Sequence, residues 1–223
     1  MQNAECKMQN AEQATPVRKR VRVRFTKHDD LRWISHRDLM RLWERLFRRA
    51  GVALSMTEGF HPKPRINFPS ALAVGIAGLD ELLEVDLAEE RTADSLAEAI
   101  AGELPEGMSI KAIEMLAAPD RKAQVRFVTF QMPVPVERQE KLGQRIKWLM
   151  RQTSLPIHRE GRKNPLDLQP LLAELELIDG QLHMRLRVDR EGSARPREVL
   201  QALEIEDLEY QGFFLTRTRV EAE

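Results

Sequence analysis

Apolar and polar residues alternate in several short runs along the chain, and each run predicts a strand with one buried face. The first run covers residues 21–26, where Val21, Val23 and Phe25 alternate with polar residues. Asp179-Gly180 is typical of a two-residue hairpin turn between two later runs. The remaining strands are expected at residues 66–76, 82–87, 108–116, 125–132, 155–160, 171–178, 182–188 and 208–220.

Four other segments place apolar residues at helical spacing. Ser35, with Asp38 three residues later, is suited to cap the first of these helices, and Gly51 is suited to end it. Thr92 is placed to cap the second, and Pro196 fits the first turn of the fourth. The predicted helices cover residues 36–50, 93–104, 137–152 and 196–203.

The elements follow the order β-α-β-β-α-β in the first half of the chain, and the second half repeats this order with one additional short strand, at 155–160, after its first helix. This order predicts an α+β protein built from two tandem ferredoxin-like (βαββαβ) domains. We expect the first domain at residues 17–118 and the second at residues 119–223, joined near 117–123. Residues 1–16 contain the run Met-Gln-Asn-Ala-Glu twice, lack an apolar face and are expected to form a disordered tail.

Composition narrows the function classes. The 42% of hydrophobic and 31% of charged residues are typical of a globular protein. The single cysteine, Cys6, excludes an internal disulfide and a cysteine-rich zinc or iron–sulfur site, so we expect no cofactor and no metal. No apolar run approaches the length of a membrane span, and no secretory signal is present. A cytoplasmic protein without a membrane partner is therefore expected.

The formal net charge is zero, but the charges are distributed in blocks. Residues 17–65 carry +9, residues 66–120 carry −10, residues 121–163 carry +8 and residues 164–223 carry −6. Such asymmetry is typical of a surface that faces a polyanion, but it also arises when basic and acidic blocks pair with each other. Both alternatives stay open at the level of sequence.

The densest basic cluster surrounds the start of the first helix and the loop at 58–65. The N–H groups at a helix start favour an anion, whereas cations there do not stabilise the helix itself. We therefore expect the cluster to bind phosphate, unless nearby acidic residues pair with its cations. The ring of Phe60, which lies beside cations in this loop, can stack on a base, or it can anchor the loop in the core. The expected ligand-binding residues are Lys27, Arg32, Ser35, Arg37, Arg41, Phe60, Lys63 and Arg65.

Two histidines of this cluster, His36 and His61, are the candidate catalytic residues. They could supply general acid and base steps without a metal, for example in RNA cleavage, provided that they converge in space. No metal site is expected, since His36 and Asp38 lack the helical spacing that ligands on one face need. The signatures of P-loop, dinucleotide-binding, zinc-protease and serine-hydrolase proteins are absent.

Three stretches together resemble a known family. They are Lys27 with Leu31–Arg41 (LRWISHRDLMR), then Arg48–Gly51 (RRAG), then Glu58–Arg65 (EGFHPKPR). They resemble the radical-SAM-linked family of uncharacterised bacterial proteins, whose members are encoded beside, or fused to, a radical SAM protein. The resemblance extends from about Val21 to the C-terminus, through Arg195–Leu200 (RPREVL) and the Arg217-Thr218 tail.

The resemblance implies a radical SAM protein as partner. A radical SAM enzyme binds its cluster through three closely spaced cysteines, so this chain is not expected to be that enzyme. The family's histidine at the position of His61 is not invariant, which favours His36 as the catalytic candidate. We expect an accessory protein that binds RNA, such as tRNA, or another phosphate-bearing ligand for the partner. Two alternatives are an RNA-processing or modification enzyme that uses His36, and a structural docking module.

Overall fold

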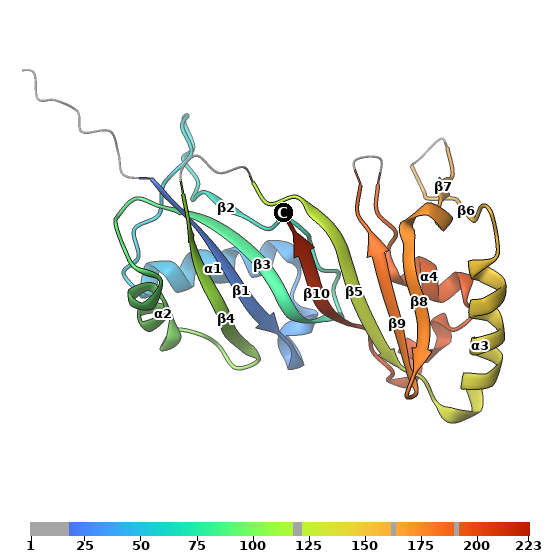
Figure 1. Ribbon diagram of the computed structural model, residues 1–223. Helices are drawn as coiled ribbons and strands as arrows, with labels where there is room; N and C mark the ends of the chain where they lie inside the picture. Colours follow the sequence, from blue (N-terminus) through green and yellow to red (C-terminus); the bar gives the residue numbers. More distant parts are fainter. Residues whose placement is uncertain (1–17, 118–121, 162–163, 190–191) are drawn as a thin grey trace, which may run out of the picture.

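The computed structural model describes residues 18–117, 122–161, 164–189 and 192–223. The expected tail at 1–16 and most of the expected junction at 117–123 lie outside these ranges. One eight-stranded sheet runs through the described part of the chain, and the α-helices pack against one of its faces (Figure 1). The α+β class expected from the sequence is confirmed.

Each half of the chain contributes two of the α-helices and a set of neighbouring strands of the sheet. The first half contains β1 (Lys19–Lys27), α1 (His36–Arg49), β2 (Ile66–Asn67), β3 (Ala77–Leu87), α2 (Ala93–Ala101) and β4 (Met108–Leu116). The second half contains β5 (Val125–Pro133), α3 (Val136–Met150), β6 (Pro156–Ile157), β7 (Leu166–Asp167), β8 (Leu172–Ile178), β9 (Gln181–Arg187), α4 (Pro196–Ala202) and β10 (Thr216–Ala222). Short 3-10 segments lie at Asp29–Trp33, Gln169–Leu171 and Glu206–Gln211.

The two halves share the sheet, whose strand order is β4-β1-β3-β10-β5-β9-β8 with β2 beside β3. Within each half all paired neighbours are antiparallel. The halves join where β3 and β10 pair in parallel, with Ala77 opposite Thr216 and Gly78 opposite Arg217. The division into two separate ferredoxin-like domains stays a prediction.

The local signals in the sequence produce the expected boundaries. The Ser35 hydroxyl accepts a hydrogen bond from the backbone N–H of Asp38 at 3.2 Å, which caps α1. Gly51 follows α1 with a φ of 64°, a left-handed conformation that glycine adopts without strain. Asp179 and Gly180 have φ values of 49° and 73°, and this turn sets the register of β8 and β9.

The strand expected at 82–87 begins earlier, at Ala77, and three other predicted strands are longer than the strands observed. The strand expected at 66–76 is only β2, because residues 68–76 form a loop that contains Pro69, a residue without a backbone N–H. The strand expected at 155–160 is only β6. The strand expected at 208–220 begins at Thr216, since residues 206–211 form a 3-10 segment that ends at Gly212 with a φ of 93°.

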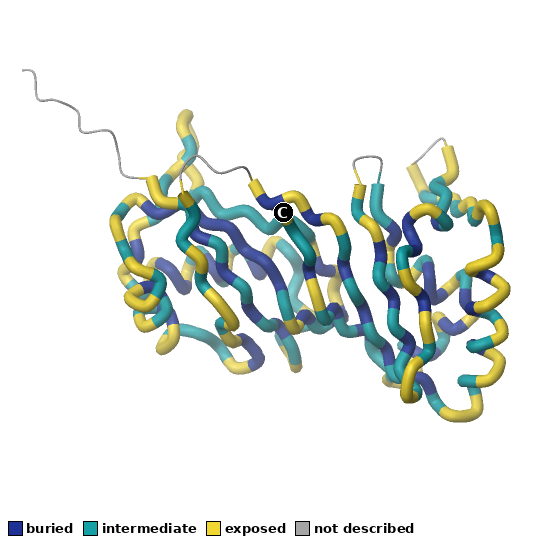
Figure 2. The backbone as a smooth tube through the Cα atoms, viewed as in Figure 1, coloured by how far each residue is buried: buried dark blue, intermediate teal, exposed yellow. Residues whose placement is uncertain are grey.

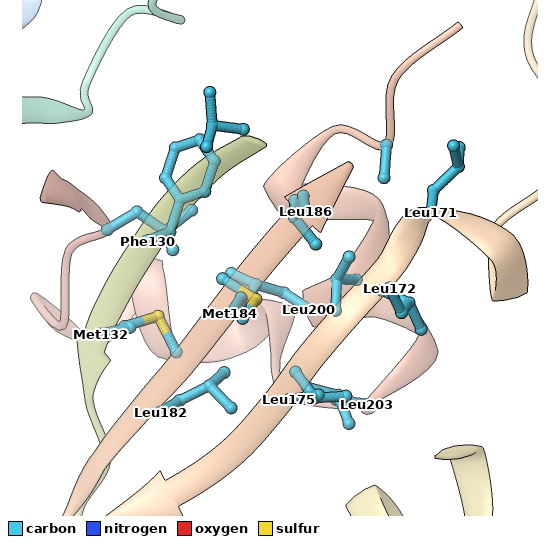
Figure 3. Packing of buried hydrophobic residues seen from close by; sticks show 14 of the residues in the cluster. Phe130, Met132, Leu171, Leu172, Leu175, Leu182, Met184, Leu186, Leu200 and Leu203 are labelled. Atoms are coloured by element: carbon cyan, nitrogen blue, oxygen red, sulfur yellow. The ribbon is translucent and has the colours of Figure 1, made fainter. Parts of the chain in front are cut away.

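Both hydrophobic cores lie between the sheet and the helices. Along β1 buried residues alternate with partly exposed ones, as the dark blue and teal segments in Figure 2 show. In the first half the ring of Phe25 lies 5.0 Å from that of Trp43, edge to face. In the second half β5, β8 and β9 pack against α4 (Figure 3). The labelled residues of this second core are Phe130, Met132, Leu171, Leu172, Leu175, Leu182, Met184, Leu186, Leu200 and Leu203.

Candidate nucleic-acid interface

Most arginines of the first basic block are paired inside the protein. On β1, Arg20 donates to the Asp86 carboxylate at 2.8 Å, and Arg24 donates to Asp80 at 2.7 Å. These acids belong to the acidic block at 66–120, so the alternative in which the blocks pair with each other holds for this strand. Similar pairs join Arg22 to Glu84, Arg49 to Glu103, Arg138 to Asp207, and Arg159 to Glu198.

A row of arginines on α1 is different. Its four members occupy helix positions i, i+4, i+8 and i+11, which places them on one side, and all four are exposed. The opposite side of α1 is buried and holds Leu39, Trp43, Leu46 and Phe47. We call this set the α1 arginine row; it consists of Arg37, Arg41, Arg45 and Arg48.

The α1 arginine row is largely free of internal partners. Arg41 approaches the Asp38 carboxylate at 3.7 Å, and both side chains are more than half exposed. Arg37, Arg45 and Arg48 form no ion pair within the described ranges of the chain. Because an exposed pair of this kind contributes little, the positive charge of the row is available to an external anion.

At the start of α1 an acidic side chain supplies the anion. The Ser35 hydroxyl donates to the Asp38 carboxylate at 2.7 Å while it accepts from the Asp38 N–H. The alternative of a nearby acidic partner therefore applies to Ser35, whose hydroxyl is engaged in capping. The ring of His36 packs edge to face against Phe68 at 5.3 Å between centroids.

Lys27 does not belong to the surface cluster. It ends β1 and is only 1% exposed, beside Glu81 and Arg217. Burial lowers the pKa of Lys27, and the nearby negative charge of Glu81 opposes this change. Its expected role in binding an external phosphate is a sequence inference that the structure corrects, because a side chain inside the protein cannot contact a large ligand.

The expected loop at 58–65 overlaps with a hairpin that spans residues 56–64. The backbone N–H of Thr57 donates to the carbonyl of Lys63 at 2.8 Å, and Arg65 braces the base by donating to the Met56 carbonyl at 2.9 Å. Phe60 is fully exposed at its tip, so its ring does not plug the loop into the core. His61 and Lys63 are exposed beside it. The hairpin projects beyond the sheet and is yellow at its tip in Figure 2.

The two candidate catalytic histidines do not come together. His36 follows the Lys27 end of β1, whereas the hairpin with His61 lies beyond the opposite end, where Ser55 bonds to Asp86. The nine residues of β1 separate these ends by about 26 Å. These positions argue against a shared acid–base step between His36 and His61.

Arg32 belongs to an aromatic cluster that sequence reasoning missed. Its guanidinium lies 4.1 Å from the centroid of the Phe214 ring and 5.0 Å from that of Trp33. The two rings meet edge to face at 6.0 Å. Trp33 is 51% exposed even though it is held in this contact. The adjacent Arg32 and Trp33 could have indicated a cation–aromatic contact, but Phe214 lies too far along the chain to be linked to them by sequence pattern alone.

Two cavities accompany these surfaces. One cavity of about 700 Å³ is lined by residues that include Arg24, Arg187 and Arg219. Another of about 740 Å³ lies between the loop at 69–76, β5 and α4. Neither is lined by His36 or His61. Among the described residues, no group of three or more His, Cys, Asp or Glu is placed to hold a metal ion, and no helix is long and apolar enough to cross a membrane.

Comparison with models of known protein families shows the family of this chain. The model of the family described as "Uncharacterized protein conserved in bacteria (DUF2344)" matches residues 20–196. The matched region begins in β1 and reaches the first residue of α4, so it contains the α1 arginine row and the hairpin at 56–64. No curated protein matches the chain.

Proposed function

The chain belongs to the uncharacterised bacterial family DUF2344, and from that premise we propose that it is an RNA-binding protein whose contact surface is the α1 arginine row. One observation carries the proposal: the row is exposed and largely unpaired, whereas the arginines of β1 are paired with acids. Arginine suits this role because its planar fork of donors matches the oxygens of a phosphate.

The dimensions of the row favour a polyanion over a single nucleotide. A helix rises 1.5 Å per residue, so Arg37 and Arg48 are separated by about 16 Å along α1. One phosphate group cannot contact both ends of such a row, but successive phosphates of an RNA strand can. Binding of this kind releases counterions from the RNA, which makes the affinity depend steeply on salt.

Filter binding of bulk tRNA at about 50 mM and about 200 mM salt tests the proposal. With four phosphate contacts the wild-type affinity should fall on the order of 100-fold between these conditions. The triple variant Arg37→Ala, Arg41→Ala and Arg45→Ala should bind weakly at both salts. A matched triple variant at α3 and its C-cap, which exchanges Lys141, Lys147 and Arg151 for alanine, removes the same formal charge from exposed positions and should bind like the wild type.

Three results would overturn the proposal. They are the absence of binding at low salt, binding that does not respond to salt, and equal loss in the α1 and α3 variants. The last result would mean that only net charge matters, because both variants lose three positive charges.

In this proposal, a radical SAM protein is the partner that acts on the RNA bound by this chain. It is supported by the resemblance of residues 31–65 to the radical-SAM-linked family. The enzymatic alternative has less support, since His36 packs against Phe68 and is remote from His61. If His36→Ala abolished an RNA conversion by the purified chain, the enzymatic alternative would replace the accessory role.

Docking to the partner is a second candidate function, favoured by the fully exposed ring of Phe60. Exposed aromatic residues are enriched among those that dominate protein interfaces. Phe60→Ala should then abolish co-purification with the proposed radical SAM partner and leave tRNA binding unchanged. Loss of tRNA binding in the same variant would instead assign Phe60 to base stacking, the other role considered for it.

A further inference from the structure

We infer that Trp33 and Tyr210 form a stacking site for unpaired RNA bases, placed next to the α1 arginine row. The inference rests on the proposed function and names its substrate class, single-stranded RNA. Both rings are accessible: Trp33 is 51% exposed and Tyr210 is 94% exposed. We call Trp33, Tyr210, Arg32 and Arg197 together the junction surface.

The junction surface is assembled from both halves of the chain. Trp33 and Arg32 come from the 3-10 segment before α1, and Arg197 comes from α4. Gly75 connects them: its N–H donates to the Arg32 carbonyl at 2.8 Å, and a side chain at this position would lie 3.0 Å from the Trp33 ring and 3.3 Å from the Arg197 guanidinium. Arg197 in turn pairs with Glu209, the neighbour of Tyr210, at 2.7 Å.

The indole of Trp33 is held in place before any ligand binds. Arg32 stacks on Phe214 at 4.1 Å, and the Trp33 ring meets Phe214 edge to face at 6.0 Å. The backbone of Gly75 lies against the same indole, in a left-handed conformation with a φ of 85°. A ring fixed in this way but half exposed offers a flat face without an ordering cost on binding, which is what base stacking requires.

Charge and position favour a nucleic acid as the occupant. The guanidinium of Arg32 lies 5.0 Å from the centroid of the Trp33 ring, and the α1 arginine row starts at Arg37, only four residues after Trp33. Proteins that bind single strands combine aromatic rings for the bases with cations along the backbone. A duplex cannot use the rings, because its bases are already stacked on each other.

The test compares a 12-nucleotide oligoadenylate with a duplex RNA of the same length, both by filter binding to the full chain. Trp33→Ala should weaken the oligoadenylate about tenfold and leave the duplex unchanged. Trp33→Phe should restore most of the loss, and Tyr210→Ala should reproduce part of it. The slope of log affinity against log salt should stay the same in all three variants, because the phosphate contacts are retained.

Trp148→Ala is the matched control. Trp148 is 48% exposed, and Arg145 stacks on it at 4.3 Å, but it lies on α3. This variant removes an equally exposed, arginine-stacked indole and should not change the affinity for oligoadenylate. Thermal unfolding followed by circular dichroism verifies that each variant is folded. If Trp33→Ala is unfolded, the inference is tested by comparing the oligoadenylate affinities of Trp33→Phe and Tyr210→Ala with that of Trp148→Ala.

The outcomes separate this inference from the proposed function. If the α1 triple variant loses RNA but the variants at Trp33 and Tyr210 bind like the wild type, the inference is overturned and the proposed function stands. If the Trp33 variants weaken the duplex as much as the oligoadenylate, stacking is refuted. If they release a co-purifying protein while RNA binding persists, the junction surface is a protein interface and the inference is overturned.

Discussion

Replacing Arg217 with methionine should destabilise the fold strongly, because this guanidinium links β10, β3 and the loop after β2. All five of its N–H groups are used: two bond to the Glu81 carboxylate, two to Ser70 and one to the Ala71 carbonyl. Arg217 and Glu81 are only 2% and 3% exposed. The pair therefore sits at the parallel contact that joins the two halves of the sheet.

The magnitude follows from what remains after the substitution. Removing one partner of a buried ion pair costs about 3–5 kcal/mol, since the other charge stays buried without compensation. Lys27 lies near Glu81 and offsets part of its charge, which points to the lower end, about 3 kcal/mol. This is a large share of the 5–15 kcal/mol that is typical of the stability of a whole domain, about 10 kcal/mol on average.

Urea unfolding followed by circular dichroism measures the effect, with the free energy of unfolding taken from linear extrapolation. Arg217→Met and Glu81→Gln are compared with the double variant, in which no unpaired carboxylate is left. The double variant should cost about 1–3 kcal/mol less than the sum of the single ones. Arg126→Met, which breaks the exposed pair with Glu223, should change stability by less than about 0.5 kcal/mol.

Two results would refute this reasoning. One is a cost of Arg217→Met below about 1 kcal/mol, which would mean that water or a rearranged partner replaces the guanidinium. The other is additivity of the two single variants, because residues whose energies add do not interact in the native state.

Two further predictions concern acid stability and backbone strain. Burial raises the pKa of Asp86, but hydrogen bonds from arginines, Arg20 foremost, lower it below its ordinary value of 3.8. Because the unfolded chain takes up this proton at a higher pH than the folded chain, the stabilisation from Asp86 is lost as pH falls from 3.8 through the folded-state pKa. In Asp86→Asn the free energy of unfolding, measured against pH, should therefore fall less over this range. Gly107→Ala should cost about 1–3 kcal/mol in urea unfolding, because φ is 79° and the new methyl would lie 2.7 Å from the His28 carbonyl oxygen. Gly102→Ala, with a φ of −73° and open space, should stay within about 0.5 kcal/mol; equal costs for the two glycines would contradict the strain argument.

The short-range features of the fold were predictable from the sequence. The alternation of Val21, Val23 and Phe25 predicts β1, and Ser35 and Gly51 mark the two ends of α1. Such signals work because each depends on hydrogen bonds and side-chain directions within a few residues. The expected exposure of the arginines on α1 follows from the same spacing, since they lie off the apolar stripe.

Long-range pairing decided the rest. Whether a β1 arginine meets a phosphate or an acid depends on which strand lies beside it, and β3 places Asp86 opposite Arg20. Similarly, Lys27 is buried because β10 brings Arg217 to the sheet, and Trp33 becomes a fixed, exposed ring because Phe214 and Gly75 meet it. These contacts join residues far apart in the chain, so no local pattern encodes them. The sequence by itself therefore determined the elements and their exposed charges, whereas only the tertiary structure decided which of those charges and rings remain available to a ligand.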